Sequence, residues 1–146
     1  MNNILNIDRM DYIMLLQLHA PTIQGFRVHP NLNLSQVWHH IPKQFEVGGV
    51  MCGKEVNNIG EIHSLTLVPS LLPHQDAYYF DTNVYKHKQV YCGQYDILGS
   101  FHTHPYNLTH PSTQDRSVSQ QLQVPGCVFT PNNLSCYHGW KDIPLH

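Results

Sequence analysis

Hydrophobic and polar residues alternate with a period of two over residues 59–68, which predicts a β-strand with one buried face. A short apolar run over residues 45–53 carries one acid and the paired glycines Gly48 and Gly49. This run predicts a buried strand in which the glycines permit a close approach of neighbouring backbones. Residues 95–104 predict a further strand, which ends on a pair of histidines.

Other segments carry the spacing of apolar positions that is typical of helices. Residues 7–18 predict an amphipathic helix, with a strand as the alternative because Leu15 and Leu16 are adjacent. Ser35 and Asp81 are expected to cap the next two helices. The expected helices cover residues 7–18, 36–40, 82–91 and 113–123.

The order of these elements predicts the fold class. The remaining expectations are an irregular segment at 24–33, a short strand at 78–80, and a hairpin of 127–130 with 134–138. Strands interleaved with helices indicate an α/β or α+β layered fold, with one sheet and helices packed against it. A length of 146 residues fits one domain, 1–146, in which the role of residues 1–40 is left open.

Charge narrows the classes of partner. The chain has 8 Lys and Arg residues against 10 Asp and Glu, and its formal net charge is -2. No basic cluster offers a counterion-releasing patch, so we expect no nucleic-acid partner. The one basic concentration, residues 86–88, is interpreted as a solvated helix face. The 12 histidines do not by their number indicate a metal, since most are expected at the surface or in hydrogen bonds.

The cysteines lack the two-residue spacing of a zinc knuckle or a thioredoxin motif; they are Cys52, Cys92, Cys127 and Cys136. The N-terminus lacks the pattern of a secretory signal, and no apolar run reaches membrane-spanning length. We therefore expect free thiols in a reducing cytoplasm, with leaderless export as the alternative. Cys52 is expected to be a small core residue, and pairing of Cys127 with Cys136 is left open.

The stretch GSFHTHPYNLTHPSTQD, residues 99–115, carries the main candidate chemistry. His102 and His104 are one residue apart and therefore share one face of the expected strand. Asp115 completes a set of two nitrogens and one oxygen, which leaves a fourth position for water as in catalytic zinc sites. Ser112 and Asp115 also form a helix-capping pattern, which by itself explains both residues.

This stretch resembles a known motif. His-x-His, then seven residues, then Ser-x-x-Asp is similar to the JAMM motif of the MPN+ (JAB-domain) zinc metalloprotease family. His102, His104, Ser112 and Asp115 occupy its defining positions. The resemblance points to a small prokaryotic or phage-type member of that family.

The family also carries an upstream glutamate, in the form E-x-x-G-x-x-x-G. Glu46 matches this form together with Gly49 and Gly53. Glu55 and Glu61 lack the glycines that follow, so Glu46 is the preferred residue.

The resemblance implies a fold and a mechanism. The implied fold is MPN/JAB-like, a cytidine-deaminase-like mixed β-sheet with helices packed on its faces. One Zn²⁺ per chain would be held by His102, His104 and Asp115 and would activate a water. Glu46 would act as general base, and Ser112 would donate to the oxyanion. The implied function is a metallopeptidase or isopeptidase that acts at the C-terminal tail of a ubiquitin-like protein.

Two alternatives accompany this interpretation. One is a secreted effector or toxin peptidase that acts on host proteins, and the other is an inactive MPN-type binding or scaffold module. The intact set of site residues argues against the inactive module. A deaminase is disfavoured because the H-x-E and P-C-x-x-C pairing is missing. His110 is interpreted as a loop or substrate-contact residue, because a fourth protein ligand would displace the water.

Overall fold

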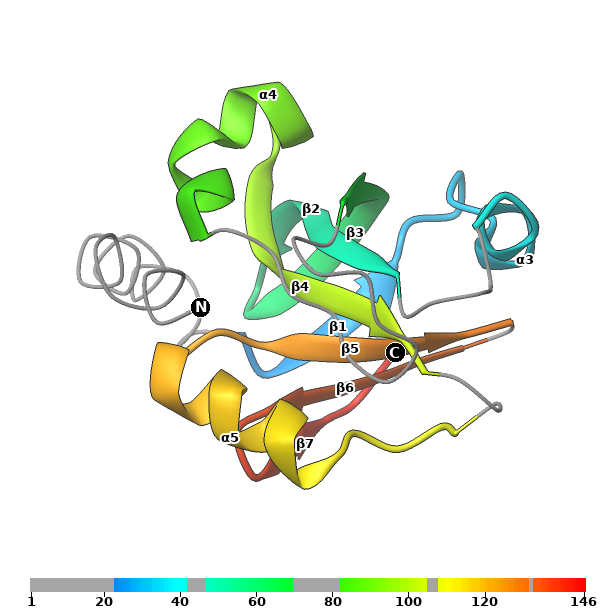
Figure 1. The fold of residues 1–146 in the computed structure, drawn as a ribbon. Coiled ribbons are helices and arrows are strands. Elements are labelled where there is room, and N and C mark those ends of the chain that lie inside the picture. The colour runs from blue at the N-terminus through cyan, green and yellow to red at the C-terminus, as the bar shows by residue number, and fades with distance from the viewer. Residues whose placement is uncertain (1–22, 42–46, 70–81, 105–107, 132) are drawn as a thin grey trace.

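One mixed β-sheet organises the protein (Figure 1). The structure is a computed structural model, which describes residues 23–41, 47–69, 82–104, 108–131 and 133–146. Within these residues the sheet has seven strands in the order β1-β3-β2-β4-β5-β6-β7. The strands are β1 (Gly25–Val28), β2 (Gly48–Val56), β3 (Ile59–Val68), β4 (Asp96–Thr103), β5 (Gly126–Thr130), β6 (Asn133–His138) and β7 (Lys141–Ile143).

Short helices surround this sheet (Figure 1). The described helices are α3 (Leu34–His39), the 3-10 helix η2 (Thr82–His87), α4 (Lys88–Cys92) and α5 (Thr113–Leu122). Helix α4 contacts β2, β3 and β4, whereas α5 contacts β6. The mixed α/β fold expected from the sequence is therefore confirmed.

Both faces of the central strands are buried, which explains the continuous apolar run of β2. Met51 on β2 and Phe101 on β4 belong to one core cluster, which includes residues that pack against α3. Val50 and Cys52 belong to a second cluster with Ile97, on the side of η2 and α4. Because neighbouring residues of a strand point to opposite faces, β2 contributes to both clusters. The sheet is thereby fixed on both sides.

Backbone geometry explains two features of the β2–β3 hairpin. Asn57 and Asn58 have φ angles of 53° and 66° and join the strands in a tight turn, which asparagine tolerates better than most residues. At Gly49 a Cβ atom would collide with the backbone carbonyl of Thr66. The close backbone approach predicted for the paired glycines is thus confirmed at Gly49.

The C-terminal residues cover the edge of β1. The amide of Phe26 donates to the carbonyl of Pro144 at 2.9 Å, and the amide of His146 donates to the carbonyl of Phe26 at 2.7 Å. Phe26 and Leu145 form a parallel bridge. Pairing of this kind removes an exposed strand edge, which would otherwise be open to aggregation.

The predicted elements agree with the structure in most described regions. The strand at 59–68 has the predicted bounds, and α5 begins at the predicted residue. The irregular segment predicted at 24–33 is wrong, because β1 forms there by parallel pairing with β3, which lies far along the chain. Helix α3 is capped by Asn33 rather than by Ser35. Strand β7 was not predicted, since its three residues carry no clear periodicity.

Some predictions fall outside the described residues. These are the helix at 7–18, the strand at 78–80, the cap at Asp81 and the first residues of the strand at 45–53. The helix predicted at 82–91 is divided into the 3-10 helix η2 followed by α4.

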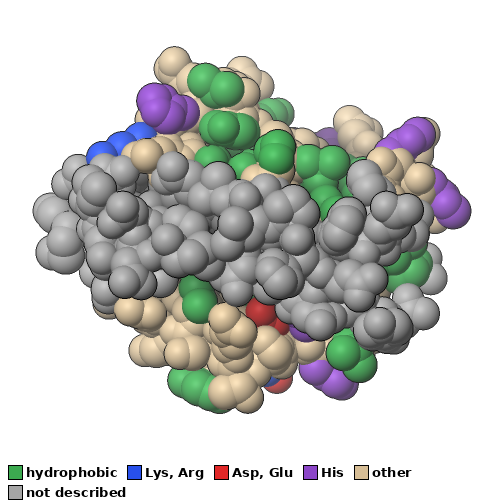
Figure 2. All heavy atoms as spheres, in the orientation of Figure 1, with side chains coloured by type: hydrophobic (Ala, Val, Ile, Leu, Met, Phe, Trp, Pro, Cys, Tyr) green, Lys and Arg blue, Asp and Glu red, His purple; other side chains and the backbone are tan. Residues whose placement is uncertain are grey.

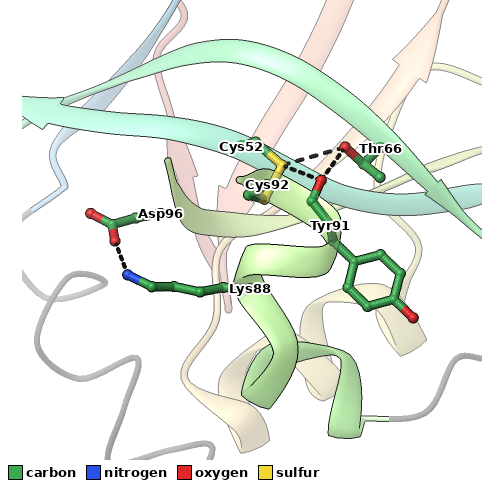
Figure 3. The surroundings of a disulfide bond; sticks show 6 residues. All are labelled: Cys52, Thr66, Lys88, Tyr91, Cys92 and Asp96. Atoms are coloured by element: carbon green, nitrogen blue, oxygen red, sulfur yellow. Dashed lines mark hydrogen bonds and ion pairs between the residues drawn. A yellow bond between two sulfur atoms is a disulfide. The ribbon is translucent and has the colours of Figure 1, made fainter. Parts of the chain in front are cut away.

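The expectation of free thiols is wrong. Cys52 pairs with Cys92, and Cys127 pairs with Cys136, so all four cysteines form disulfides. The first bond ties β2 to the end of α4, beside a hydrogen bond from the Thr66 hydroxyl to the Tyr91 carbonyl (Figure 3). Sequence spacing did not reveal this pair because 40 residues separate its cysteines.

Candidate metal centre

The candidate ligands come from the end of β4 and the first turn of α5. His102 and His104 lie two residues apart, so their side chains leave the same face of the extended chain. The Nε2 atoms of the two rings are 2.9 Å apart. Oδ2 of Asp115 lies 2.9 Å from Nε2 of His104 and 3.1 Å from Nε2 of His102. Three ligand atoms therefore form a nearly equilateral triangle.

A capping box places Asp115. The Ser112 hydroxyl accepts a hydrogen bond from the Asp115 amide at 3.0 Å, and Asp115 Oδ2 accepts from the Ser112 amide at 2.8 Å. Each residue thus satisfies a backbone donor that the helix N-terminus leaves without an intrahelical partner. The capping interpretation is confirmed, and the cap directs the carboxylate toward the two histidines.

The electrostatics of Asp115 favour its charged form. Burial alone would raise the pKa of this carboxyl. Hydrogen bonds with His102 and His104, the charge of His102 and the Ser112 amide outweigh burial, and they hold the pKa of Asp115 well below its usual range. An ionised carboxylate is the form that binds a metal cation.

Two further residues fix α5 on the sheet. Arg116 forms an ion pair with Asp142 at 2.6 Å and donates to the carbonyl of Gly139 at 3.3 Å. The Ser119 hydroxyl donates to the carbonyl of Val124 at 2.6 Å and accepts from the Gly139 amide at 2.8 Å. The helix that carries Asp115 is therefore held against the turn between β6 and β7.

The three side chains fit a zinc ion by chemistry and by spacing. Ligand atoms about 2.0 Å from a tetrahedral zinc lie about 3.3 Å from one another, close to the observed 2.9 to 3.1 Å. Two imidazole nitrogens and one carboxylate oxygen are a common ligand set for catalytic zinc. With three protein ligands, a fourth tetrahedral position is left for water.

The other predicted site residues are placed in part. Glu46 lies outside the described residues, but Val47, which follows it, is hydrogen-bonded to Thr103 between the two histidines. His110 is exposed. The described histidines of the helices are exposed as well. Figure 2 shows that histidine side chains are spread over several parts of the surface rather than gathered in one place.

The sequence did not single out a second group of metal-type side chains, formed by His29, Glu61 and His63. Oε1 of Glu61 lies 2.8 Å from Nε2 of His63, and the rings of His29 and His63 stack with their centroids 4.3 Å apart. The period of two places Glu61 and His63 on one face of β3, but nothing in the sequence indicates that His29 joins them.

Comparison with protein families identifies the fold. A family model described as prokaryotic homologs of the JAB domain matches residues 34–140. The chain belongs to this family. The match covers α3 to the turn after β6 and thus includes His102, His104, Ser112 and Asp115. The resemblance inferred from the motif is confirmed.

Solved structures resemble this chain at low sequence identity. Protein DSY2949 from Desulfitobacterium hafniense, a solution structure, is 14% identical, with a TM-score of 0.60 over 83% of this chain and 91% of that one. AF2198, a JAB1/MPN domain protein from Archaeoglobus fulgidus, is 11% identical, with a TM-score of 0.47 over 85% and 98%. No curated protein matches the chain.

The helices of this JAB domain are short. Among the described residues, none has the length and apolar composition needed to cross a membrane.

Proposed function

We propose that the chain is a zinc-dependent metallopeptidase that hydrolyses an amide or isopeptide bond. Family membership and the cluster of two histidines and an aspartate support a metal-dependent hydrolase. The convergence of three ligand atoms at 2.9 to 3.1 Å carries the proposal, because it matches the ligand set of a zinc ion with an open position. A zinc ion bound there supplies Lewis-acid chemistry, which lowers the pKa of water and polarises a carbonyl group.

Glu46 is the proposed general base. Its carboxylate takes a proton from the attacking water and returns it to the amine that leaves. The assignment is supported by the glycines at 49 and 53, which complete the family pattern, and by the link from Val47 to Thr103.

Ser112 is the proposed oxyanion donor. In the capping box its Oγ uses a lone pair to accept the Asp115 amide. The proton of the hydroxyl is therefore free to be donated to the negative oxygen that develops during attack. One serine can thus both cap α5 and stabilise the transition state.

The proposed substrate class is a protein with an extended C-terminal tail, as in ubiquitin-like proteins. An extended tail can bind by adding a strand beside the site, which brings its last peptide bond to the ligands. A delivered effector that cleaves host proteins would use the same residues on a different substrate.

The test uses the purified full chain with ubiquitin-like fusions and isopeptide conjugates. We expect wild type to bind about one zinc per chain and to cleave. Glu46→Gln should retain zinc and lose about 10²- to 10⁴-fold in rate, since it removes a general base. Asp115→Asn should lose both zinc and activity, whereas Glu55→Gln, which changes a carboxylate on β2, serves as the matched control.

Two results would contradict the proposal. A wild-type protein without stoichiometric zinc would contradict the proposed metal centre. This outcome would favour the inactive binding module. Equal cleavage by wild type and Glu46→Gln would contradict the role of Glu46 as general base. It would not contradict the metal centre.

A further inference from the structure

Thr103 lies between the two histidine ligands and faces the other way. Its side chain is buried, with 6% of the residue exposed. The amide of Thr103 donates to the carbonyl of Val47 at 2.7 Å. In return the amide of Val47 donates to the hydroxyl oxygen of Thr103 at 3.0 Å. Two hydrogen bonds therefore join these residues across the start of β2 and the end of β4.

The second of these bonds departs from a regular β-ladder. Gly48 pairs with His102 in the antiparallel register, so Val47 is opposite Thr103. In a regular hydrogen-bonded pair, both residues exchange backbone amide-to-carbonyl bonds. Here the side-chain hydroxyl of Thr103 takes the place of its backbone carbonyl. The last rung between the strands therefore depends on the side chain at position 103, and valine, which has the same shape, cannot form it.

Val47 is covalently joined to Glu46, the proposed general base. A fixed Val47 backbone limits where the preceding residue can lie relative to His102 and His104. We propose that Thr103 is a positioning residue for Glu46, which acts through the backbone of Val47; this inference rests on the proposed function. In this proposal Thr103, which lies between the two histidines, has a role distinct from metal binding.

The experiment compares Thr103→Val and Thr103→Ser in the full chain with the zinc-bound wild type. Thr103→Val should keep its zinc and lose about 10- to 100-fold in kcat with little change in KM, the cost of a catalytic group misplaced by about 1 Å. Thr103→Ser keeps the hydroxyl and should restore most of the rate. Thr66→Val removes a similar hydroxyl-to-backbone bond on β3 and should leave kcat unchanged.

A double substitution separates positioning from general stability. If Thr103 acts through Glu46, Thr103→Val should cost nothing more in a Glu46→Gln background, because the group that it positions is already absent. An equal loss in both backgrounds would overturn the inference. If valine at position 103 prevents folding, comparison of Thr103→Ser with Thr103→Ala isolates the hydroxyl in the same way.

The failure of this inference differs from the failure of the proposed function. An active wild type with an unaffected Thr103→Val variant overturns the inference alone. A wild type that holds no zinc and cleaves no substrate overturns both.

Discussion

Two groups of two histidines and one carboxylate occur in the described part of the chain, and they differ in how their rings are oriented. His102 and His104 are inclined by 57°, and their Nε2 atoms approach to 2.9 Å. The rings of His29 and His63 are inclined by only 28° and are stacked. The ligand atoms of the first group lie within 3.1 Å of one another, whereas those of the second lie within the wider limit of 4.8 Å.

The carboxylates of the two groups, Asp115 and Glu61, also differ in how they contact their partners. Asp115 directs one oxygen at both histidines of its group. Glu61 binds His63 through one oxygen and Arg27 through the other, at 3.0 Å. The Arg27 hydrogen bond, opposed in part by desolvation and supported by His63, lowers the pKa of Glu61. The second group is therefore an ion-pair and stacking network, which Tyr95 extends by stacking on His63.

The two groups lie at opposite ends of β4. Tyr95 precedes its first residue and His104 follows its last, so about 26 Å of extended strand separates them. Two groups with the same residue types thus differ in geometry. The orientation imposed by a strand end and a capped helix makes the difference.

The largest expected difference between the groups is in bound zinc. His104→Ala should remove the proposed zinc ion and the proposed peptidase activity, because two ligands cannot replace the three-ligand set. His63→Ala should leave the zinc content of the purified protein unchanged. Elemental analysis of both variants decides this, and loss of zinc in His63→Ala would show that the stacked group also binds metal.

The disulfides offer a second comparison, since each lies in a different half of the sheet. Removing Cys52–Cys92 as a double serine variant should cost about 4 kcal/mol of unfolding free energy, and removing Cys127–Cys136 about 2.5 kcal/mol. The reason is loop length, because the separations are 40 and 9 residues. Denaturant unfolding measures both values, and a reversed order would show that native-state packing dominates.

The smallest effect comes from the helix caps. Ser112→Ala and Asn33→Ala each remove a side-chain cap, of α5 and of α3, and each should cost about 1 kcal/mol of stability. Ser112→Ala should in addition weaken zinc binding by about 10- to 100-fold, since it releases the residue that orients Asp115. Zinc titration with thermal unfolding separates the two effects. Equal zinc affinity in both variants would limit Ser112 to capping.

Periodicity and local spacing predicted much of this protein. Alternation over residues 59–68 gave β3 its bounds, because residues 60, 62 and 68 of one face are buried and residues 64 and 66 are half-buried. The Ser-x-x-Asp spacing predicted the start of α5, because a capping box is formed by residues three positions apart. The His-x-His spacing predicted a shared side-chain direction, which depends only on the extended backbone.

These local rules did not predict contacts between residues that are far apart in the sequence. Strand β1 exists because β3 pairs with it, and Cys52 meets Cys92 only because α4 packs on β2. The convergence of Asp115 on the two histidines and the Thr103–Val47 link likewise depend on how β4, α5 and β2 are arranged. The amino-acid sequence by itself determined the local elements and the ligand types, since both follow from short-range spacing. The tertiary structure alone decided how the rings of the two similar histidine groups are oriented, because ring orientation is set by packing between elements.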